Sequence, residues 1–254
     1  MIHTYKDLDR ISSMDGTSVP KIMWRTGPYR ANAIPSQVMD IFRKTMRTNP
    51  DHLMFYFNDR DCRSFVADHY PEYLQDYDDL VPTAYKADIW RYMVLDKFGG
   101  CYADLTQDLD VSYEDLCKDV DGVFCRDYAM HSCDLYNAMM CSMPGDIVVQ
   151  RTLTRSISNI RSRYYGGGTL AITGPIVLGR AYKDLIENTQ RSVPIRTGRN
   201  DKYMILEHIG YKRISMDGTI IGRTKAEWHH SSLYDEIKQK HYSQLWHDRQ
   251  VYRN

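Results

Sequence analysis

The segment 83–105, TAYKADIWRYMVLDKFGGCYADL, restricts most strongly what this chain can fold into. Apolar side chains recur at helical spacing through its first part, and one stripe contains Ala87, Trp90, Met93, Val94 and Phe98. Gly99 and Gly100 are typical of a helix end, and the β-prone run 101–105 follows them at once. A helix that leads directly into a short strand predicts an α/β fold.

The residues before this segment alternate between strand and helix patterns. We predict strands over 19–26 (VPKIMWRT) and 52–59 (HLMFYFND), because both are short, rich in apolar side chains and bounded by turn residues. A helix is predicted over 35–48, with a proline near its start, and a more polar helix around 61–69. Strands that alternate with helices usually pair in parallel, so we expect a mixed, mostly parallel sheet flanked by helices.

The second half of the chain carries weaker signals of the same kind. We predict a strand over 122–125, a helix near 145–162 and a strand and turn over 170–175 (LAITGP). Three glycines at 166–168 separate the last two. They lack the surroundings of a phosphate-binding loop, so we interpret them as a flexible turn.

The charges of the chain balance, with 33 basic and 33 acidic side chains. This balance argues against the basic surface of a nucleic-acid-binding domain, but it is compatible with a local patch for an anionic substrate. We find no run of about 18 apolar residues and no apolar stretch near the N-terminus. We therefore expect a soluble, cytoplasmic protein with no membrane span and no nucleic-acid partner.

Six cysteines are scattered along the chain, at positions 62, 101, 117, 125, 133 and 141. They include no CxxC pair, which argues against a structural zinc site. In a chain of 254 residues, this distribution is more typical of reduced, buried thiols than of a disulfide framework.

Four oxygen-bearing side chains lie at or just after the end of the strand at 101–105: Asp104, Thr106, Asp108 and Asp110. Hard divalent cations prefer oxygen ligands, and open α/β sheets bind ligands where their strands end. Taken alone, the pattern is typical of a solvated acidic loop, and a metal site is the alternative that the surrounding residues favour.

Two further groups of residues could take part in ligand binding. Asp88 and Arg91 are three residues apart on the predicted helix and share one face, either as a structural ion pair or as groups aimed at a polar ligand. Trp24, with Arg25 and Thr26, ends the first predicted strand. An aromatic face there could stack on a nucleobase, although such tryptophans more often belong to the core.

Together these pieces resemble glycosyltransferase family 32, the DXD-containing sugar transferases that include initiating α-mannosyltransferases. They also resemble the glucosylating domain of clostridial toxins. The most specific part is AYKADIWRYMVLDKFGGCYADL, in which an Ala-Asp-x-x-Arg-Tyr helix runs into Gly-Gly-x-Tyr-x-Asp. VPKIMWRTG, TNPDHLMFYFND, YPEYLQDYDDL, NAMMCSMPGD and ITGP extend the resemblance over roughly residues 19–180.

The resemblance implies a single GT-A glycosyltransferase domain over residues 1–254, with its core at about 19–180. It implies transfer of a sugar from a UDP- or GDP-sugar to a glycan or other hydroxyl acceptor, with retention of configuration and with Mn²⁺ or Mg²⁺ as cofactor. Two rival functions stay open. One is a capsule-type sugar-phosphate transferase, and the other is a non-catalytic relic that only binds the nucleotide sugar.

The resemblance also implies roles for individual residues. Trp24 would stack on the nucleobase and Tyr102 would lie near the nucleotide. Asp88 and Arg91 would hold hydroxyl groups of the donor sugar, and Asp104 would be the first aspartate of the metal-binding Asp-x-Asp motif. The catalytic group is then predicted to be Asp88, Arg91 and Asp104, and the donor-binding group Trp24, Arg25, Thr26, Asp88, Arg91 and Tyr102.

The sequence departs from the family at Thr106, where the family has the second aspartate of the motif. Thr106 could bind the metal itself, Asp108 or Asp110 could replace the missing carboxylate, or metal binding could be weakened. We favour Asp104 as the direct ligand, assisted by Asp108 or Asp110. A third ligand is expected from the pair His229-His230; adjacent residues of a strand face opposite ways, so only one can bind, and we choose His230.

Overall fold

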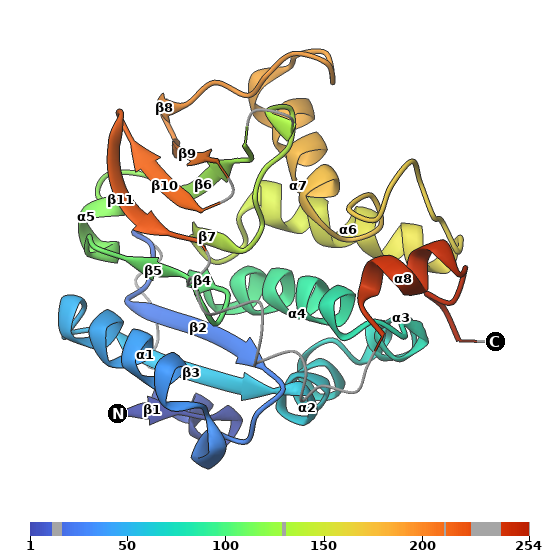
Figure 1. Cartoon of the computed structure of the whole chain (residues 1–254), viewed down its shortest axis with the longest axis horizontal. Helices are drawn as coiled ribbons and strands as arrows, with labels where there is room; N and C mark the ends of the chain where they lie inside the picture. Colours follow the sequence, from blue (N-terminus) through green and yellow to red (C-terminus); the bar gives the residue numbers. More distant parts are fainter. Residues whose placement is uncertain (12–16, 129–130, 211, 225–239, 254) are drawn as a thin grey trace.

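The computed structural model describes residues 1–11, 17–128, 131–210, 212–224 and 240–253, and within these ranges a single mixed sheet runs through the molecule (Figure 1). Its strands follow one another in the order β1 (Ile2–His3), β3 (Leu53–Asn58), β2 (Ile22–Gly27), β4 (Gly100–Ala103), β7 (Met139–Ser142), β6 (Gly122–Arg126), β9 (Tyr203–Ile209), β10 (Arg213–Met216), β11 (Thr219–Arg223) and β5 (Asp108–Leu109). A further short strand, β8 (Gly198–Arg199), pairs with β9.

Eight helices flank the sheet in the described part of the chain. They are α1 (Ser36–Thr48), α2 (Asp59–His69), α3 (Leu74–Asp79), α4 (Thr83–Phe98), α5 (Tyr113–Leu116), α6 (Ile147–Arg161), α7 (Pro175–Tyr182) and α8 (Tyr242–His247). Short 3-10 turns at Tyr5–Arg10, Ala31–Ala33 and Pro71–Tyr73 and a π-turn at Lys183–Glu187 complete the regular structure.

Parallel pairing is concentrated at the N-terminal end of the sheet. β3 pairs in parallel with β1 and β2, and β2 pairs in parallel with β4. β7 then runs antiparallel between β4 and β6, and β6 pairs in parallel with β9 before the antiparallel strands that follow. The predicted mixed sheet with flanking helices is confirmed. The carboxyl ends of β2, β3 and β4 meet at one edge, which is where such folds bind ligands.

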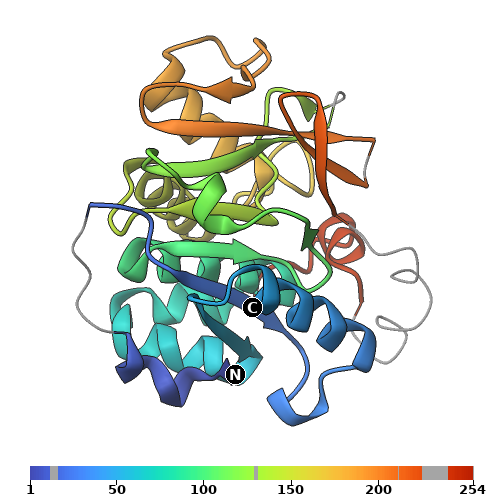
Figure 2. The ribbon, with the colours of Figure 1, turned by 90° about the vertical axis from the view of Figure 1, so that its left-hand side faces the viewer.

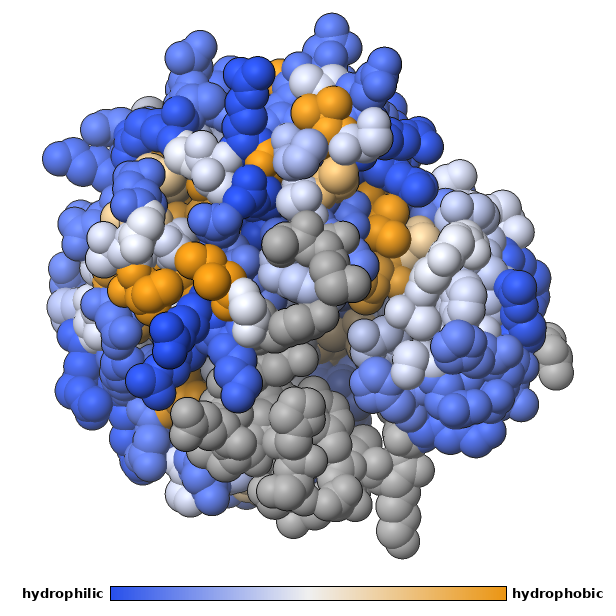
Figure 3. All heavy atoms as spheres, turned by 45° about the horizontal axis from the view of Figure 1, so that its top comes forward, coloured by the Kyte–Doolittle hydropathy of each residue, from blue (hydrophilic) through white to orange (hydrophobic). Residues whose placement is uncertain are grey.

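Two hydrophobic cores lie on opposite faces of this sheet. One is built from α2, α4, α6 and α7, and it receives Tyr102 from β4. The other is built from α1 and α5, and it receives Cys101 from the same strand. Figure 2 shows α1 on one side of the sheet and α4 and α6 on the other. On the face drawn in Figure 3 the surface is largely hydrophilic, and apolar side chains form small separate patches.

Helix α4 begins and ends where the sequence predicts, at Thr83 and Phe98, but it is buried on more than the predicted stripe. Nine of its sixteen residues are buried, because the helix lies on the sheet while α2 and α6 pack against it. Two of the nine are charged, Asp88 and Arg91. Because both charged groups are buried, each needs ion-pair or hydrogen-bond partners inside the protein.

The turn at Gly99-Gly100 explains how α4 leads directly into β4. Both glycines have positive φ angles, 62° and 92°, which residues with a Cβ rarely adopt. A Cβ at Gly100 would also lie 2.6 Å from the carbonyl oxygen of Ile22 on β2. Two glycines therefore let the chain reverse while β4 packs closely beside β2.

The predicted strand at 170–175 is wrong. These residues form a turn, and helix α7 begins at Pro175. Side chains from distant helices occupy the carbonyl oxygens that a strand would use. Tyr92 Oη donates to the carbonyl of Thr173 (2.9 Å), and Asn159 Nδ2 donates to that of Ile172 (2.9 Å). Ala171 and Ile172 of this stretch are buried without being paired in a sheet.

Within the described ranges, no helix is both long enough and apolar enough to cross a bilayer.

Candidate functional site

Asp104 presents a carboxylate at the carboxyl edge of the sheet, directly after β4. Its Oδ1 accepts a hydrogen bond from Tyr102 Oη (2.6 Å) and another from Arg91 Nη2 (3.3 Å). Its Oδ2 has no hydrogen-bond partner among the described residues, and 42% of the side chain is exposed. One oxygen therefore fixes the orientation of the carboxylate, while the other is available to a ligand.

Arg91 is the buried centre of this arrangement, with only 6% of its side chain exposed. Its Nη1 donates to the carbonyl of Asn137 (2.8 Å) and lies 3.1 Å from Asp88 Oδ1. The guanidinium also lies over the ring of Tyr102, 4.5 Å from its centroid. A single buried cation is thus shared between two carboxylates, which offsets the cost of placing them in the protein interior.

Asp88 is held on both of its oxygens. Asn137 Nδ2 donates to Oδ1 (2.9 Å), and Thr173 Oγ1 donates to Oδ2 (2.7 Å). Burial raises the pKa of Asp88, while Arg91 and these hydrogen bonds act in the opposite direction. The ion pair between Asp88 and Arg91 that the helical spacing suggested is present, whereas contact of either residue with a donor sugar stays a prediction.

Asn137 and Thr173 contact Asp88 in the structure, a role that their positions in the sequence do not predict. Both lie in segments that resemble the family, NAMMCSMPGD and ITGP. Nothing in their local pattern indicates that their side chains bind Asp88, because they are 49 and 85 residues away from it along the chain.

Arg25 holds the backbone of the loop after Asp104 and is itself almost completely buried, with 1% exposed. Its Nη1 donates to the carbonyl oxygens of Asp104 and Gln107, and the guanidinium lies near the ring of Phe42. The predicted role of Arg25 in binding the nucleotide therefore does not fit. Its hydrogen bonds go to the protein backbone and set the position of the loop.

Thr106 does not fit its predicted role as a metal ligand. The residue is 4% exposed, and its hydroxyl donates to the carbonyl of Thr224 (3.5 Å). Gln107 Nε2 donates to the same carbonyl (3.1 Å) and to Tyr136 Oη (2.6 Å). A carboxylate at position 106 would turn an acceptor toward this carbonyl, whereas a threonine supplies the donor that it needs.

Asp108 does not fit the predicted assisting role either. Lys44 Nζ lies 2.7 Å from Asp108 and 2.6 Å from Asp110, so one ammonium group binds both carboxylates. Asp108 also belongs to β5, where it pairs with Arg223 of β11. Both acidic residues are therefore used to hold β5 against α1.

Trp24 belongs to the core and has no free ring face for a nucleobase. It is fully buried, stacks on Phe55 with ring centroids 4.9 Å apart, and donates from Nε1 to the carbonyl of Gly99 (2.7 Å). The alternation of a strand explains the error, since this side chain points into the core under α4 instead of toward the edge.

A cavity of about 290 Å³ opens at the carboxyl end of β2, and Ala87, the neighbour of Asp88 along α4, is part of its lining. It lies where β2 ends and where α2 and α4 begin, and its lining includes Thr26, Asp59, Lys86 and Ala87. Burial raises the pKa of Asp59 and lowers that of Lys86. Thr26 is thus the one residue of the predicted group Trp24-Arg25-Thr26 that lines this cavity.

Asp104 offers a hard oxygen ligand for a divalent cation at this edge. It belongs to no cluster of three or more carboxylate, imidazole or thiol ligands in the part of the chain that the structure describes. His230 lies outside the described residues. This donor set fits a cation such as Mg²⁺ or Mn²⁺ that is held by one carboxylate together with phosphate oxygens of a substrate.

A comparison with known protein families matches the part of the chain that carries this arrangement. Residues 35–114 match the family described as the glycosyltransferase sugar-binding region containing the DXD motif. This part of the chain is similar to DXD-type glycosyltransferases. The resemblance to glycosyltransferase family 32 is thereby confirmed, and the matched residues of the DXD region run from α1 into α5 and include Asp88, Arg91 and Asp104.

Two curated relatives come from Schizosaccharomyces pombe. Inositol phosphoceramide mannosyltransferase 3 is 33% identical over 95 residues, which cover 37% of this chain and 26% of that protein. Inositol phosphoceramide mannosyltransferase 2 is 24% identical over 230 residues, or 88% of this chain and 62% of that protein. The chain therefore spans less than two thirds of either relative.

A solved structure, the PaToxG glycosyltransferase, shares the fold over part of this chain. It superposes with a TM-score of 0.54 at 16% identity and covers 67% of this chain and 70% of its own. This likeness supports the predicted GT-A-like α/β fold.

Proposed function

We propose that this chain transfers a sugar from a nucleotide-sugar donor to a hydroxyl group of an acceptor, with retention of the anomeric configuration. One observation carries the proposal. Asp104 stands at the carboxyl edge of the sheet with one oxygen fixed by Tyr102 and Arg91 and the other available. The DXD-type family match supports a glycosyltransferase as the class of enzyme.

In this proposal Asp104 holds Mn²⁺ or Mg²⁺ together with the diphosphate of the donor. Such a cation, when bound, offsets the negative charge that grows on the leaving nucleoside diphosphate. Arg91 and Tyr102 keep the carboxylate in place so that no reorientation is needed during the reaction. His230 remains a candidate for a further ligand.

Asp88 and Arg91 are proposed to position the donor sugar. The space beside Asp88 Oδ2 is kept open by Gly174, since a Cβ there would lie 3.6 Å from this oxygen. A carboxylate oxygen accepts more than one hydrogen bond, so Oδ2 can bind a sugar hydroxyl in addition to Thr173. Binding that holds the sugar in one orientation removes rotational and translational entropy before the reaction. The activation barrier of the transfer step is lower as a result.

We assign no nucleophile to the protein. A retaining glycoside hydrolase needs two carboxyl groups on either side of the sugar, one of them as nucleophile. In a retaining transferase the acceptor hydroxyl can instead attack on the face that the leaving group vacates. The two carboxylates of the network, Asp88 and Asp104, share one guanidinium and are then used for binding.

The nucleoside of a UDP- or GDP-sugar is proposed to lie in the cavity lined by Thr26, Asp59 and Lys86. The names of the relatives favour mannose as the sugar and an inositol-bearing acceptor as the first compound to test.

A thermal-shift panel of nucleotide sugars, each with and without Mn²⁺ or Mg²⁺, tests the proposal. We expect a cation-dependent rise in Tm with one donor, because a ligand that binds the folded state stabilises it. The rise should be lost in Asp104→Asn and kept in the control Asp110→Asn, whose carboxylate binds Lys44. The absence of a shift with every donor would contradict the proposal.

The product then separates the rival activities. The proposed transferase releases a nucleoside diphosphate and leaves the acceptor without added phosphate. A sugar-phosphate transferase would leave phosphate in the acceptor linkage, and a relic would show the Tm shift with neither transfer nor hydrolysis of the donor. The relic in particular has to be tested, because Thr106 supplies no carboxylate where the family has its second aspartate.

A further inference from the structure

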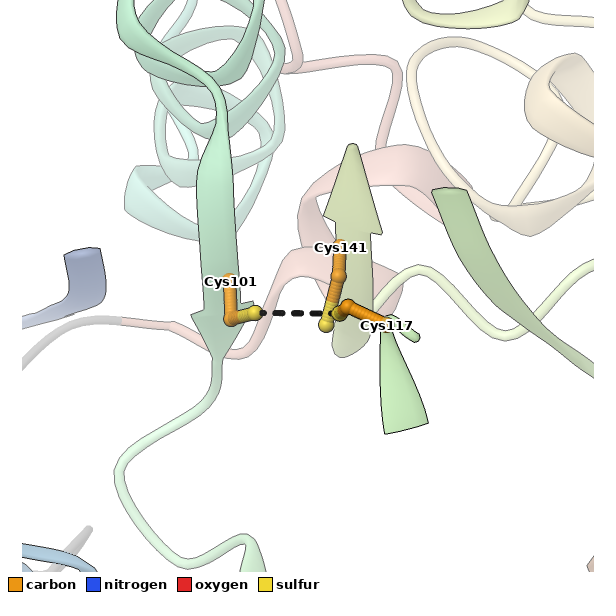
Figure 4. Close-up of side chains that lie close together, drawn as sticks. All are labelled: Cys101, Cys117 and Cys141. Atoms are coloured by element: carbon orange, nitrogen blue, oxygen red, sulfur yellow. Dashed lines mark hydrogen bonds between the residues drawn. The ribbon is translucent and has the colours of Figure 1, made fainter. Parts of the chain in front are cut away.

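Three cysteines from three different elements meet on the face of the sheet opposite α4. Cys101 of β4 faces Cys141 of β7 in the antiparallel register, and Cys117 follows the end of α5 (Figure 4). Their sulfur atoms all lie within 4.8 Å of one another, and those of Cys101 and Cys117 are 3.8 Å apart. All three are buried, with 1%, 0% and 9% exposed for Cys101, Cys141 and Cys117.

This spacing suits a metal ion bound by sulfur. Three sulfur ligands at about 2.3 Å from one ion lie roughly 3.8–4.0 Å from each other in tetrahedral or planar arrangements. The observed sulfur positions need to close only slightly to reach it. Thiolates select soft cations, above all Cu⁺ and Zn²⁺. We propose that Cys101, Cys117 and Cys141 form a buried three-thiolate site for such a thiophilic cation.

The other buried cysteines show that this convergence is not general. The sulfur of Cys62 contacts the hydroxyl of Thr26 (3.1 Å), and that of Cys125 contacts the carbonyl of Arg126 (3.6 Å). Cys125 lies in the same hydrophobic core as the three-cysteine cluster, yet its sulfur is not part of the cluster. Burial of thiols in this core therefore does not by itself bring sulfur atoms together.

A path to the cluster exists. A cavity of about 800 Å³ is lined by Cys101 and Cys117 and also by His52 and Glu114. It lies beside the residues that begin β2 and β3, at the sheet edge opposite to Asp104. The thiol site is therefore separate from the proposed donor site, and a cation can reach it without passing the carboxylate network.

Each cysteine binds the cation as a thiolate, so a ligand that is still protonated releases its proton to solvent. Burial raises the pKa of Cys101 and Cys141, so these two thiols keep their protons at neutral pH until a cation displaces them. Hydrogen bonds with Cys101 and Cys141 lower the pKa of Cys117 to about 5. A bound cation would link β4, the end of α5 and β7. Its ligand on β4, Cys101, lies three residues before Asp104. Its expected effect is on stability instead of on the transfer step.

Titration of the metal-free full chain tests the site. Zn²⁺ and Cu⁺ are offered in separate experiments, each in competition with a chromogenic chelator of known affinity. We expect one ion to bind per chain, protons to be released on binding, and Tm to rise with the same ion. The ion that competes successfully identifies the site as one for Zn²⁺ or for Cu⁺.

Two variants and a matched control make the result specific. Cys117→Ser and Cys141→Ala should bind the ion about 100-fold more weakly or not at all. Cys125→Ala, which removes a thiol from the same core, should bind it like the parent protein, as should Asp104→Asn. In the unaltered chain the bound ion should also protect Cys101, Cys117 and Cys141 from alkylation while Cys133 still reacts. Binding below one ion per chain, or equal binding by Cys117→Ser, would overturn the proposal.

Discussion

The two sides of Asp104 are held in different ways. Upstream, Arg91 and Tyr102 act directly on the carboxylate through a charge and a short hydrogen bond. Downstream, Thr106 and Gln107 are uncharged and donate to the backbone carbonyl of Thr224. The orientation of the carboxylate and the path of the loop are therefore fixed by separate groups, and substitutions should affect them separately.

The largest effect is expected when the upstream charge is removed. Arg91→Met leaves Asp88 buried without its cation, and we expect the free energy of unfolding to fall by about 3–5 kcal/mol. Urea denaturation measures the change. Arg91→Lys keeps the charge but loses the forked geometry of the guanidinium. Its free energy of unfolding should therefore lie between those of the parent protein and Arg91→Met. A loss below about 1 kcal/mol in Arg91→Met would show that Arg91 does not hold the network together.

Asp104→Asn should separate activity from stability. We expect the transfer rate to fall by about 10²–10³-fold, because the carboxylate that would hold the charge-stabilising cation is lost. The free energy of unfolding should change by only about 0.5 kcal/mol, since the side chain is 42% exposed. Asp110→Asn is the control for transfer, and equal rates for the two variants would remove Asp104 from the mechanism.

Restoring the family's second aspartate should do harm. In Thr106→Asp the carboxylate faces the carbonyl of Thr224 in a buried position, and we expect a loss of about 1–3 kcal/mol in the free energy of unfolding. Transfer should not increase. If Thr106→Asp instead raised the rate or the affinity for Mn²⁺, position 106 would be a ligand position after all.

Tyr102→Phe should have a smaller effect, confined to the carboxylate. It removes one hydrogen bond to Asp104 Oδ1 while Arg91 remains, so we expect about 1 kcal/mol, or roughly a fivefold fall in kcat/KM. Steady-state kinetics with the donor identified by thermal shift provide the measurement. Thr106→Val, the downstream counterpart, should change the free energy of unfolding but leave kcat/KM nearly unchanged.

The smallest effect concerns pH. The pKa of Asp88 is raised by burial, so between about pH 4 and its folded-state value the folded protein keeps a proton that the unfolded chain has released. The contribution of Asp88 to the free energy of unfolding therefore falls as pH rises through that interval. Asp88→Asn should lack this part of the dependence of Tm on pH, whereas Thr106→Val should retain it. Parallel curves for Asp88→Asn and the parent would contradict the expectation.

Much of the site upstream of Asp104 could be predicted, because the sequence patterns that indicate it are local. The helical spacing of α4, the two glycines and the strand that follows fix where Asp88, Arg91 and Asp104 stand. The downstream side could not be predicted in this way. Thr106 meets Thr224 across 118 residues, and only the folded chain shows that its hydroxyl is a donor to that carbonyl.

Trp24, Arg25 and the cysteines also have surroundings that depend on contacts between residues far apart in the sequence. The residue type and position of Trp24 and Arg25 suggested a ligand platform, but tertiary packing buries one in the core and turns the other toward a loop backbone. Spacing along the chain argued against a zinc site, yet the pairing of β4 with β7 brings Cys101, Cys117 and Cys141 together. Motif spacing detects cysteines that are close in sequence and misses a group that the folded sheet brings together.

The buried guanidinium of Arg25 has a consequence for the dynamics of the site. It holds two carbonyls of the loop, while the amide groups of Asp104 and Gln107 donate to the carbonyls of Ala138 and Asp104. These amide hydrogens should exchange with solvent as slowly as those of the neighbouring strands, because release requires breaking contacts inside the core. Little conformational entropy is then lost at this loop when a donor binds, so more of the contact energy remains available as affinity.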